Sequence, residues 1–378
     1  MPMRSQPGVI GCAIRPAIAA RDRSLEEMIY DTAQLALADA GIGIDDIDGI
    51  VVAANDQFDG RSISVMMASG SVGGVDRDIM STPSASEHAF ILGALRVATG
   101  QFRTQLVVSW SPTEVSSMAE AQRLGADPYF HRALPLDELS AHALQASALE
   151  HAWPDARTAA QAVAEKNRAH GRAAWPDPPL QPAPGPMRWP ITPAMTSAPV
   201  TGSVALVLAS PDFIAERGLR DVAWLRGMGW ATEPSFLGDR DLRTAPALAA
   251  AARQAYAAAG ITDTSAFDVA EVTDATPYCE LLAYESLSLC AREDWAARAA
   301  DGSFARGGRL PVNLSGGVLT WNPVFCTGLI RIADVASQVR GRAGAHQLPD
   351  VRCGLAHAGS GFAMQYQSAV VFAREAGA

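Results

Sequence analysis

The residues of this chain best suited to chemistry are a histidine, a tyrosine and an asparagine in its second half. His357 stands beside Gly359 and Gly361, whose flexible backbone lets a substrate approach closely, and imidazole titrates near neutral pH. Tyr278 offers a phenol that exchanges protons only when its pKa, about 10, is perturbed or a second base assists. Asn322 can donate a hydrogen bond to a developing oxyanion but cannot carry a proton.

A second group of candidates opens the segment SASEHAFILGALRVATG (84–100), a predicted helix. Ser84 and Glu87 have the spacing of a capping box, in which hydroxyl and carboxylate each satisfy a free amide at the helix start. We favour this role over nucleophilic catalysis, because a serine hydroxyl without an adjacent base is a poor nucleophile. His88 either packs within the helix or faces the same cavity as Ser84.

Structural roles compete with catalytic ones at other positions. Tyr278 is equally well explained as a core aromatic at a helix start, and His357 as a structural hydrogen-bond donor. Cys279 and Cys326 are interpreted as buried structural thiols, and His346 as a surface residue. The five cysteines show no CxxC pair or metal-ligand spacing, which predicts reduced thiols and no metal site in this chain.

Charge and hydropathy exclude several function classes. The formal net charge of −10 argues against a nucleic-acid partner. No stretch approaches the roughly 20 apolar residues needed to cross a bilayer, and the first residues carry no signal-peptide apolar core. We therefore expect no membrane association and a cytoplasmic location.

An internal repeat predicts the elements that must position these residues. Residues 32–52 read as an alanine-rich helix, a glycine stop at Gly41 and an apolar strand, and residues 251–271 repeat this order around Gly260. Helices that alternate with short apolar strands indicate βα units and an α/β fold. We predict two halves, 1–215 and 220–378. The proline- and tryptophan-rich text before residue 200 predicts an insertion at about 112–199, which either caps a site or packs on the surface.

Several segments resemble the thiolase superfamily, and in particular its sterol-carrier-protein and archaeal types. RLPVNLSGGVLTWNPVFCTGLIRIADVASQVRGRAG (309–344) resembles the thiolase signature, EVTDATPYCELLAYESLSLC (271–290) an upstream motif, and LAHAGSGFAMQYQSAVVF (355–372) the closing glycine loop and last strand. The resemblance implies a thiolase fold, with duplicated βαβαβαββ halves in a five-layered αβαβα sandwich. It also implies a coenzyme A thioester as substrate, Gly359 and Gly361 near it, and a homodimer paired through the first half's sheet.

The sequence departs from thiolases at the catalytic positions. Ser84 stands where those enzymes carry the nucleophilic cysteine at a helix N-terminus, Ala275 replaces an acid/base cysteine, and Asn322 replaces the oxyanion-hole histidine. Acyl transfer through a covalent cysteine intermediate therefore lacks its usual groups.

Tyr278 matches a tyrosine of thiolase-like aldolases that cleave steroid side chains and that also lack the nucleophilic cysteine. The resemblance implies retro-aldol cleavage of a bulky β-hydroxyacyl-CoA to a ketone and a shortened acyl-CoA, with an OB-fold zinc-ribbon partner subunit. The second tyrosine that those aldolases carry has no counterpart in 318–328, which offers Trp321 and Phe325 instead.

Three alternatives stay open from the sequence. The chain is an acyltransferase with Ser84 or Cys326 as acyl carrier, a non-catalytic thiolase-like subunit of a complex, or an enzyme of hydrolysis or another enolate reaction on a non-steroid substrate.

Overall fold

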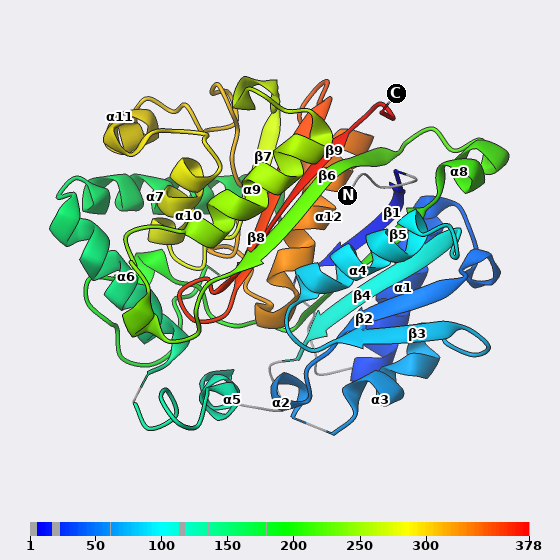
Figure 1. Cartoon of the computed structure of the whole chain (residues 1–378), viewed down its shortest axis with the longest axis horizontal. Coiled ribbons are helices and arrows are strands. Elements are labelled where there is room, and N and C mark those ends of the chain that lie inside the picture. Colours follow the sequence, from blue (N-terminus) through cyan, green and yellow to red (C-terminus); the bar gives the residue numbers. More distant parts are fainter. Residues whose placement is uncertain are drawn as a thin grey trace.

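The computed structural model describes residues 6–16, 23–60, 62–112, 118–134, 136–178 and 180–377. Within these ranges the strands form a nine-stranded mixed sheet in the order β3-β2-β4-β5-β1-β6-β9-β8-β7 (Figure 1). The sheet has two parts, one from each half of the chain, which meet where β1 and β6 pair antiparallel through Gly8–Trp224 and Val9–Ala223.

The first part holds two parallel pairings beside two antiparallel ones. β2 pairs parallel with β3 and β4, and β5 pairs antiparallel with β4 and β1. The strands are β1 (Gly8–Arg15), β2 (Gly49–Ala53), β3 (Asp78–Thr82), β4 (Thr104–Ser111) and β5 (Gly202–Ala209).

The second part repeats this plan. β7 pairs parallel with β8, β9 pairs antiparallel with β8 and β6, and Val312 forms an isolated parallel bridge to Ala270 where the first part has β3. The strands are β6 (Ala223–Thr232), β7 (Val269–Val272), β8 (Cys353–Ser360) and β9 (Tyr366–Ala373).

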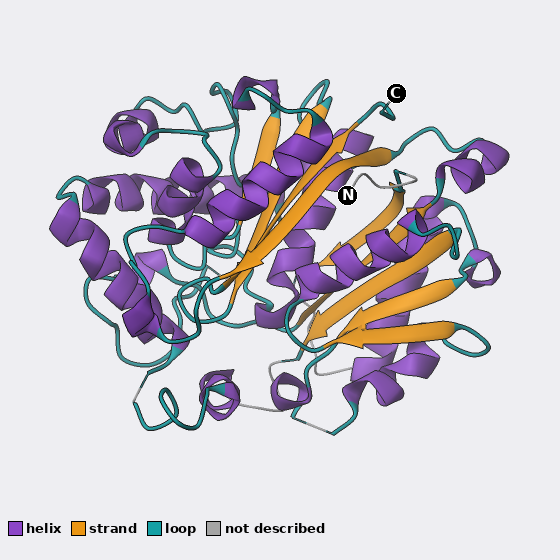
Figure 2. Ribbon diagram, in the orientation of Figure 1, coloured by secondary structure: helices purple, strands orange, loops and turns teal. Residues whose placement is uncertain are grey.

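Helices lie on both outer faces and between the two parts of the sheet (Figure 2). α1 (Leu25–Ala40) and α3 (Ser64–Ser71) cover the first part, and α9 (Pro246–Ala259) and α10 (Pro277–Ser286) cover the second. α4 (Ser86–Ala98) and α12 (Thr327–Arg340) share one apolar core between them. The result is the predicted five-layered αβαβα sandwich of the thiolase fold.

Side-chain alternation explains the layers. Ile50 and Val52 of β2 face the outer core under α1, whereas Val51 and Ala53 face the central core with α4. Both faces are apolar because both are covered, as expected for parallel strands. Every residue of α12 is buried, as its central position requires.

The chain between β4 and β5 reaches over to the second half. It forms α5 (Met118–Gly125), α6 (Glu138–Ala152) and α7 (Ala156–Ala174), and α6 and α7 pack against α10 in one apolar cluster. This segment therefore borders elements of both halves. The remaining helices are α2 (Asp56–Asp59), α8 (Pro211–Arg217) and α11 (Trp295–Ala300). Among the described helices, none combines the length and apolarity that a membrane crossing requires.

Candidate active site

A cavity of about 280 Å³ lies at the N-terminal ends of α4 and α12. Its walls come from the segments that follow β2 and β3, from the starts of α4 and α12, from the loop after β8, and from the segment that carries α5 and α6. Helix N-termini present free amides and a partial positive charge, so this point of the fold favours negative charge on a ligand. The polar lining residues are Asn55, Gln57, Ser84, Glu87, Gln122, Glu138, Thr327, Ser360, Gln365 and Tyr366.

Glu87 is the most buried carboxylate of this cavity, with 1% of the residue exposed. Ser360 donates a hydrogen bond of 2.9 Å from Oγ to Glu87 Oε1. A Cβ atom placed on Gly328 would lie 2.2 Å from Oε2, so the carboxylate packs directly against the first turn of α12. Only glycine leaves room for this carboxylate, which is a candidate general base.

The predicted capping box at the start of α4 is wrong. The N-cap residue is Ala85, without a side-chain cap, and the Glu87 carboxylate bonds to Ser360 rather than to the start of its own helix. Ser86 instead caps the neighbouring helix, since Leu329 N of α12 donates to Ser86 Oγ at 3.0 Å. Contacts with residues far along the chain thus take the place of the capping contacts expected within the first turn of α4.

Ser84 does not cap the helix, and its hydroxyl contacts an imidazole instead. Its Oγ lies 2.7 Å from His88 Nδ1, one helical turn away, and Ser84 is exposed at the cavity wall. The His88 ring also lies edge-on to the ring of Tyr366, at 5.8 Å between centroids. The structure therefore brings the hydroxyl of Ser84 and the phenol of Tyr366, which line the cavity, together with the imidazole of His88, which is not among the lining residues.

The two glycines predicted near the substrate lie on one loop but differ in position. Gly361 lines the cavity with a φ of 77°, a left-handed conformation suited to glycine. Gly359 belongs to β8 and donates its amide to Thr273 Oγ1 at 3.1 Å, outside the lining.

His357 is fully buried within β8 and is not among the lining residues. Gln367 donates its own amide nitrogen to Met364 O, so its Oε1 faces His357 and accepts from His357 Nε2 at 2.8 Å. The proton thus sits on Nε2, and Nδ1 has no hydrogen-bond partner among the described residues. Burial lowers the pKa of His357 to about 4, which suits a structural donor.

Tyr278 also lies outside the lining of the cavity. It is fully buried in α10, and its hydroxyl donates to Glu150 Oε1 of α6. Burial, together with Glu150, raises the pKa of Tyr278 above its ordinary value. The sequence predicted the helix start, but the phenol points to α6.

Asn322 and Cys326 flank the cavity without lining it. Asn322 donates from Nδ2 to Ser197 O at 3.3 Å, which ties the end of the inserted segment to the start of α12. Cys326 is fully buried, its thiol donates to Pro323 O at 3.3 Å, and burial raises its pKa. Between them, Val324 and Phe325 do reach the cavity.

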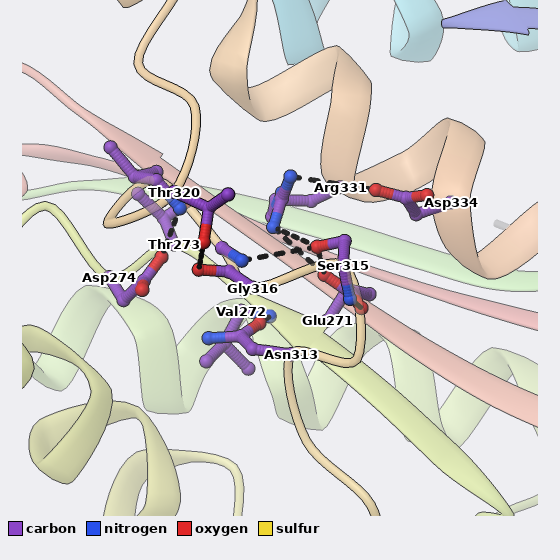
Figure 3. A network of polar contacts seen from close by, with 12 residues as sticks. Glu271, Val272, Thr273, Asp274, Asn313, Ser315, Gly316, Thr320, Arg331 and Asp334 are labelled. Carbon is purple, nitrogen blue, oxygen red and sulfur yellow. Dashed lines mark hydrogen bonds and ion pairs between the residues drawn. The ribbon is translucent and has the colours of Figure 1, made fainter. Parts of the chain in front are cut away.

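A buried polar network holds the loop that leads to α12 (Figure 3). Arg331 of α12 bonds Glu271 Oε2 and Ser315 Oγ, both at 2.8 Å. Asp274 accepts the amide of Val318 at 2.6 Å, and burial, with nearby Glu280, raises the pKa of Asp274 to about 7. These contacts fix the loop 313–322 and, through it, the N-terminus of α12.

His346, predicted at the surface, belongs to the edge of this network. It is 5% exposed, and its Nε2 lies 3.2 Å from Asp334 Oδ1. The surface prediction is wrong because the 3-10 turn Gly344–His346 folds back on α12. No cluster of three or more metal-ligating side chains occurs in the described residues.

Sequence reasoning missed several groups of the cavity, namely Tyr366, Ser360 and Glu138. Tyr366 and Ser360 lie in the closing glycine loop and strand whose motif had been recognised, so that motif was the available signal. Glu138 comes from the inserted segment, whose position over the second half only the structure gives.

Comparison with known proteins agrees with this architecture. Residues 230–374 match the family described as thiolase C-terminal domain-like. Sterol carrier protein 2 from rabbit (Oryctolagus cuniculus) and from human is 32% identical over 162 residues, which cover 41% of this chain and 29% of each relative. The match thus spans under a third of those relatives' length.

Solved structures extend the likeness to the whole chain. The Ltp2-ChsH2(DUF35) aldolase superposes with a TM-score of 0.79 at 21% identity and covers 99% of both chains. Acetyl-CoA acetyltransferase from Syntrophomonas wolfei gives a TM-score of 0.71 at 17% identity and covers 98% of this chain and 100% of its own. At such identities the likeness concerns the fold. Residues 230–374 thus match the thiolase C-terminal domain-like family, and the chain as a whole has the thiolase fold.

Proposed function

We propose that this protein is an acyl-CoA carbon–carbon lyase that cleaves a bulky β-hydroxyacyl-CoA by a retro-aldol reaction. The observation that carries the proposal is the cavity lining, in which the described residues offer two carboxylates, hydroxyls and a phenol but no thiol. A retro-aldol reaction needs a base and a site for an enolate, not a covalent acyl carrier.

The chemistry follows from the contacts of Glu87. Its carboxylate takes the proton of the β-hydroxyl, the bond between the α- and β-carbons breaks, and the β-carbon leaves as a ketone. The electron pair forms the enolate of the shortened acyl-CoA, which the amides and partial charge of the two helix N-termini stabilise. A proton then returns to the α-carbon. Ser360 holds Glu87 in place throughout.

The comparisons support parts of this proposal. The solved structure with the TM-score of 0.79 is named an aldolase and pairs Ltp2 with ChsH2(DUF35). Human mitochondrial 3-ketoacyl-CoA thiolase, a solved structure at 15% identity, is named in complex with CoA. We extend both to this chain, as an acyl-CoA substrate and a second subunit with an OB-fold and zinc ribbon, in the cytoplasm. Steroid-type acyl groups belong to the same proposal.

A homodimer through β3 is also proposed. β3 is an edge strand that pairs only with β2 among the described strands, and its residues are exposed or half-buried. Exposed apolar side chains occur on β3, in the turn before it and at the start of α3, which is typical of an interface rather than a free edge. They are Ile63, Met66, Val75 and Met80.

The test is mass spectrometry of one incubation. The purified protein, with and without the zinc-ribbon subunit, receives a tertiary β-hydroxyacyl-CoA that carries a ring system. Release of a ketone and a shortened acyl-CoA, with no free CoA added, is the expected result. No cleavage under either condition would contradict the proposal.

A second candidate function rests on the Ser84–His88 contact. A serine hydroxyl 2.7 Å from an imidazole is the arrangement of an activated nucleophile, and it suits acyl transfer or thioester hydrolysis. An acyl adduct on Ser84 after exposure to acyl-CoA, absent from Ser84→Ala, would favour this function over retro-aldol cleavage.

A further inference from the structure

A buried cysteine and histidine meet behind the cavity, where α6 packs against α10. Cys279 lies in the first turn of α10, and its Sγ is 3.4 Å from Nδ1 of His142 in α6. Both residues are buried, with 2% and 3% exposed. Thr276 Oγ1 lies 3.4 Å from the same sulfur.

The second ring nitrogen of His142, Nε2, faces Glu138, which lines the cavity. His142 Nε2 lies 3.8 Å from Oε1 of Glu138, which is beyond hydrogen-bond length, and it has no hydrogen-bond partner within the described chain. Glu138 is 31% exposed at its side chain and lines the cavity. The three groups thus form a row from the cavity to a thiol that sequence reasoning assigned a structural role.

Charge and position distinguish this thiol from the others. Burial acts to raise the pKa of Cys279, but His142 lowers it below the ordinary value. Burial acts to lower the pKa of His142, yet Cys279 and Glu138 raise it to about 10. Burial, with Asp268, raises the pKa of Cys353 to about 11 despite the nearby Arg226.

Other ionisable groups near Cys279 face elsewhere. On its own helix, Tyr278 bonds to Glu150, and Glu280 forms an ion pair with Lys166 of α7. From α6, Gln145 contributes only a neutral amide, 3.8 Å from the sulfur. Within the described structure, His142 is therefore the charged group that faces this thiol, and Glu138 acts on the thiol through His142.

We propose that Glu138, His142 and Cys279 form a proton relay that protonates the α-carbon of the enolate in the cavity. The inference rests on the proposed lyase function and supplies its missing acid. When the 3.8 Å between His142 Nε2 and Glu138 Oε1 shortens to hydrogen-bond length, imidazolium Nε2–H passes its proton to the Glu138 carboxylate, and the resulting carboxylic acid gives that proton to the α-carbon. The enolate becomes a thioester, and His142 is left neutral with Nδ1–H on the Cys279 thiolate. Exchange with water then returns a proton to His142 and removes the one that Glu87 accepted.

The first measurement needs no substrate. Ultraviolet absorbance of the thiolate is recorded against pH for the full-length protein and for Cys279→Ser, whose difference isolates this sulfur. We expect one thiolate at neutral pH, and its loss in His142→Gln. His151→Gln, an exposed histidine on the same helix, is the matched control and keeps the thiolate. Glu138→Gln, near the surface, shifts the thiolate titration to higher pH and serves if the buried variants fail to fold.

The second measurement follows the acid step alone. The protein is incubated in D2O with propanoyl-CoA, a saturated acyl-CoA of the product class, and deuterium at the α-carbon is measured by mass spectrometry. Exchange should fall at least about tenfold in Glu138→Gln and in His142→Gln, and remain unchanged in His151→Gln.

Two results would overturn the relay. One is a Cys279 that is a neutral thiol at pH 7, or a thiolate titration that is the same in the wild type and in His142→Gln. The other is wild-type exchange in both relay variants, or none in the wild type. If the protein has the thiolate and exchanges the α-proton but cleaves no β-hydroxyacyl-CoA, the relay is supported and only the proposed cleavage reaction is contradicted.

Discussion

Single residues of the cavity carry the proposed chemistry through the atoms that they contact. Glu87→Gln keeps an oxygen to accept the Ser360 hydroxyl but cannot take a proton. We therefore expect kcat of the cleavage reaction to fall about 100-fold or more, with the fold retained. Circular dichroism and steady-state kinetics measure both effects. Glu216→Gln, at the surface, is the control. Full turnover in Glu87→Gln would show that Glu87 is not the base.

His357 makes a prediction about stability rather than turnover. Because its folded pKa of about 4 lies below the ordinary 6.5, the unfolded chain binds the proton first as pH falls. Its contribution is fully present above pH 6.5 and is lost between pH 6.5 and 4, by up to about 3 kcal/mol.

The measurement is denaturant unfolding at several pH values for wild type and His357→Gln, whose amide can still donate to Gln367. The difference between the two curves isolates His357, since His170, whose pKa burial also lowers to about 4, is present in both. Curves that stay parallel from pH 7 to pH 4 would contradict the assignment.

At the scale of elements, α4 and α12 must approach closely for the cavity to exist. Gly328→Ala places a methyl group 2.2 Å from Glu87 Oε2, so we expect the carboxylate to move and kcat to fall about tenfold or more. Gly70→Ala, a helical glycine with nothing within 4 Å of an added Cβ, is the matched control. A Gly328→Ala enzyme with wild-type kcat would show that this contact is unimportant.

The elements were predictable to the extent that local rules decide them. Gly41 and Gly260 end their helices in left-handed conformation, as the repeat predicted. The start of α4 was not predictable, because Ser86 bonds an amide 243 positions away and leaves Ser84 to His88. Likewise Tyr278 was assigned by its place in a motif, but its direction depends on α6, which the sequence leaves unplaced.

At the scale of the whole molecule, the proposed dimer makes the clearest prediction. Met80→Lys puts a charge on β3, so size-exclusion chromatography with light scattering should report one chain instead of two. Leu35→Lys, on an exposed position of α1, should leave the dimer intact. A dimer that survives Met80→Lys would place the interface elsewhere.

The narrow junction between β1 and β6 has a further consequence. Two residue pairs join the sheet parts there, while Glu87 and Gly328, which nearly touch, belong to different halves of the chain. Val9 and Ala223 lie in the apolar core that α4 and α12 share, so a change of side-chain volume there would shift the two helix ends relative to each other. Substitutions at Val9 or Ala223, remote from any substrate, are thus a route by which selection can tune the reaction without altering a reacting group.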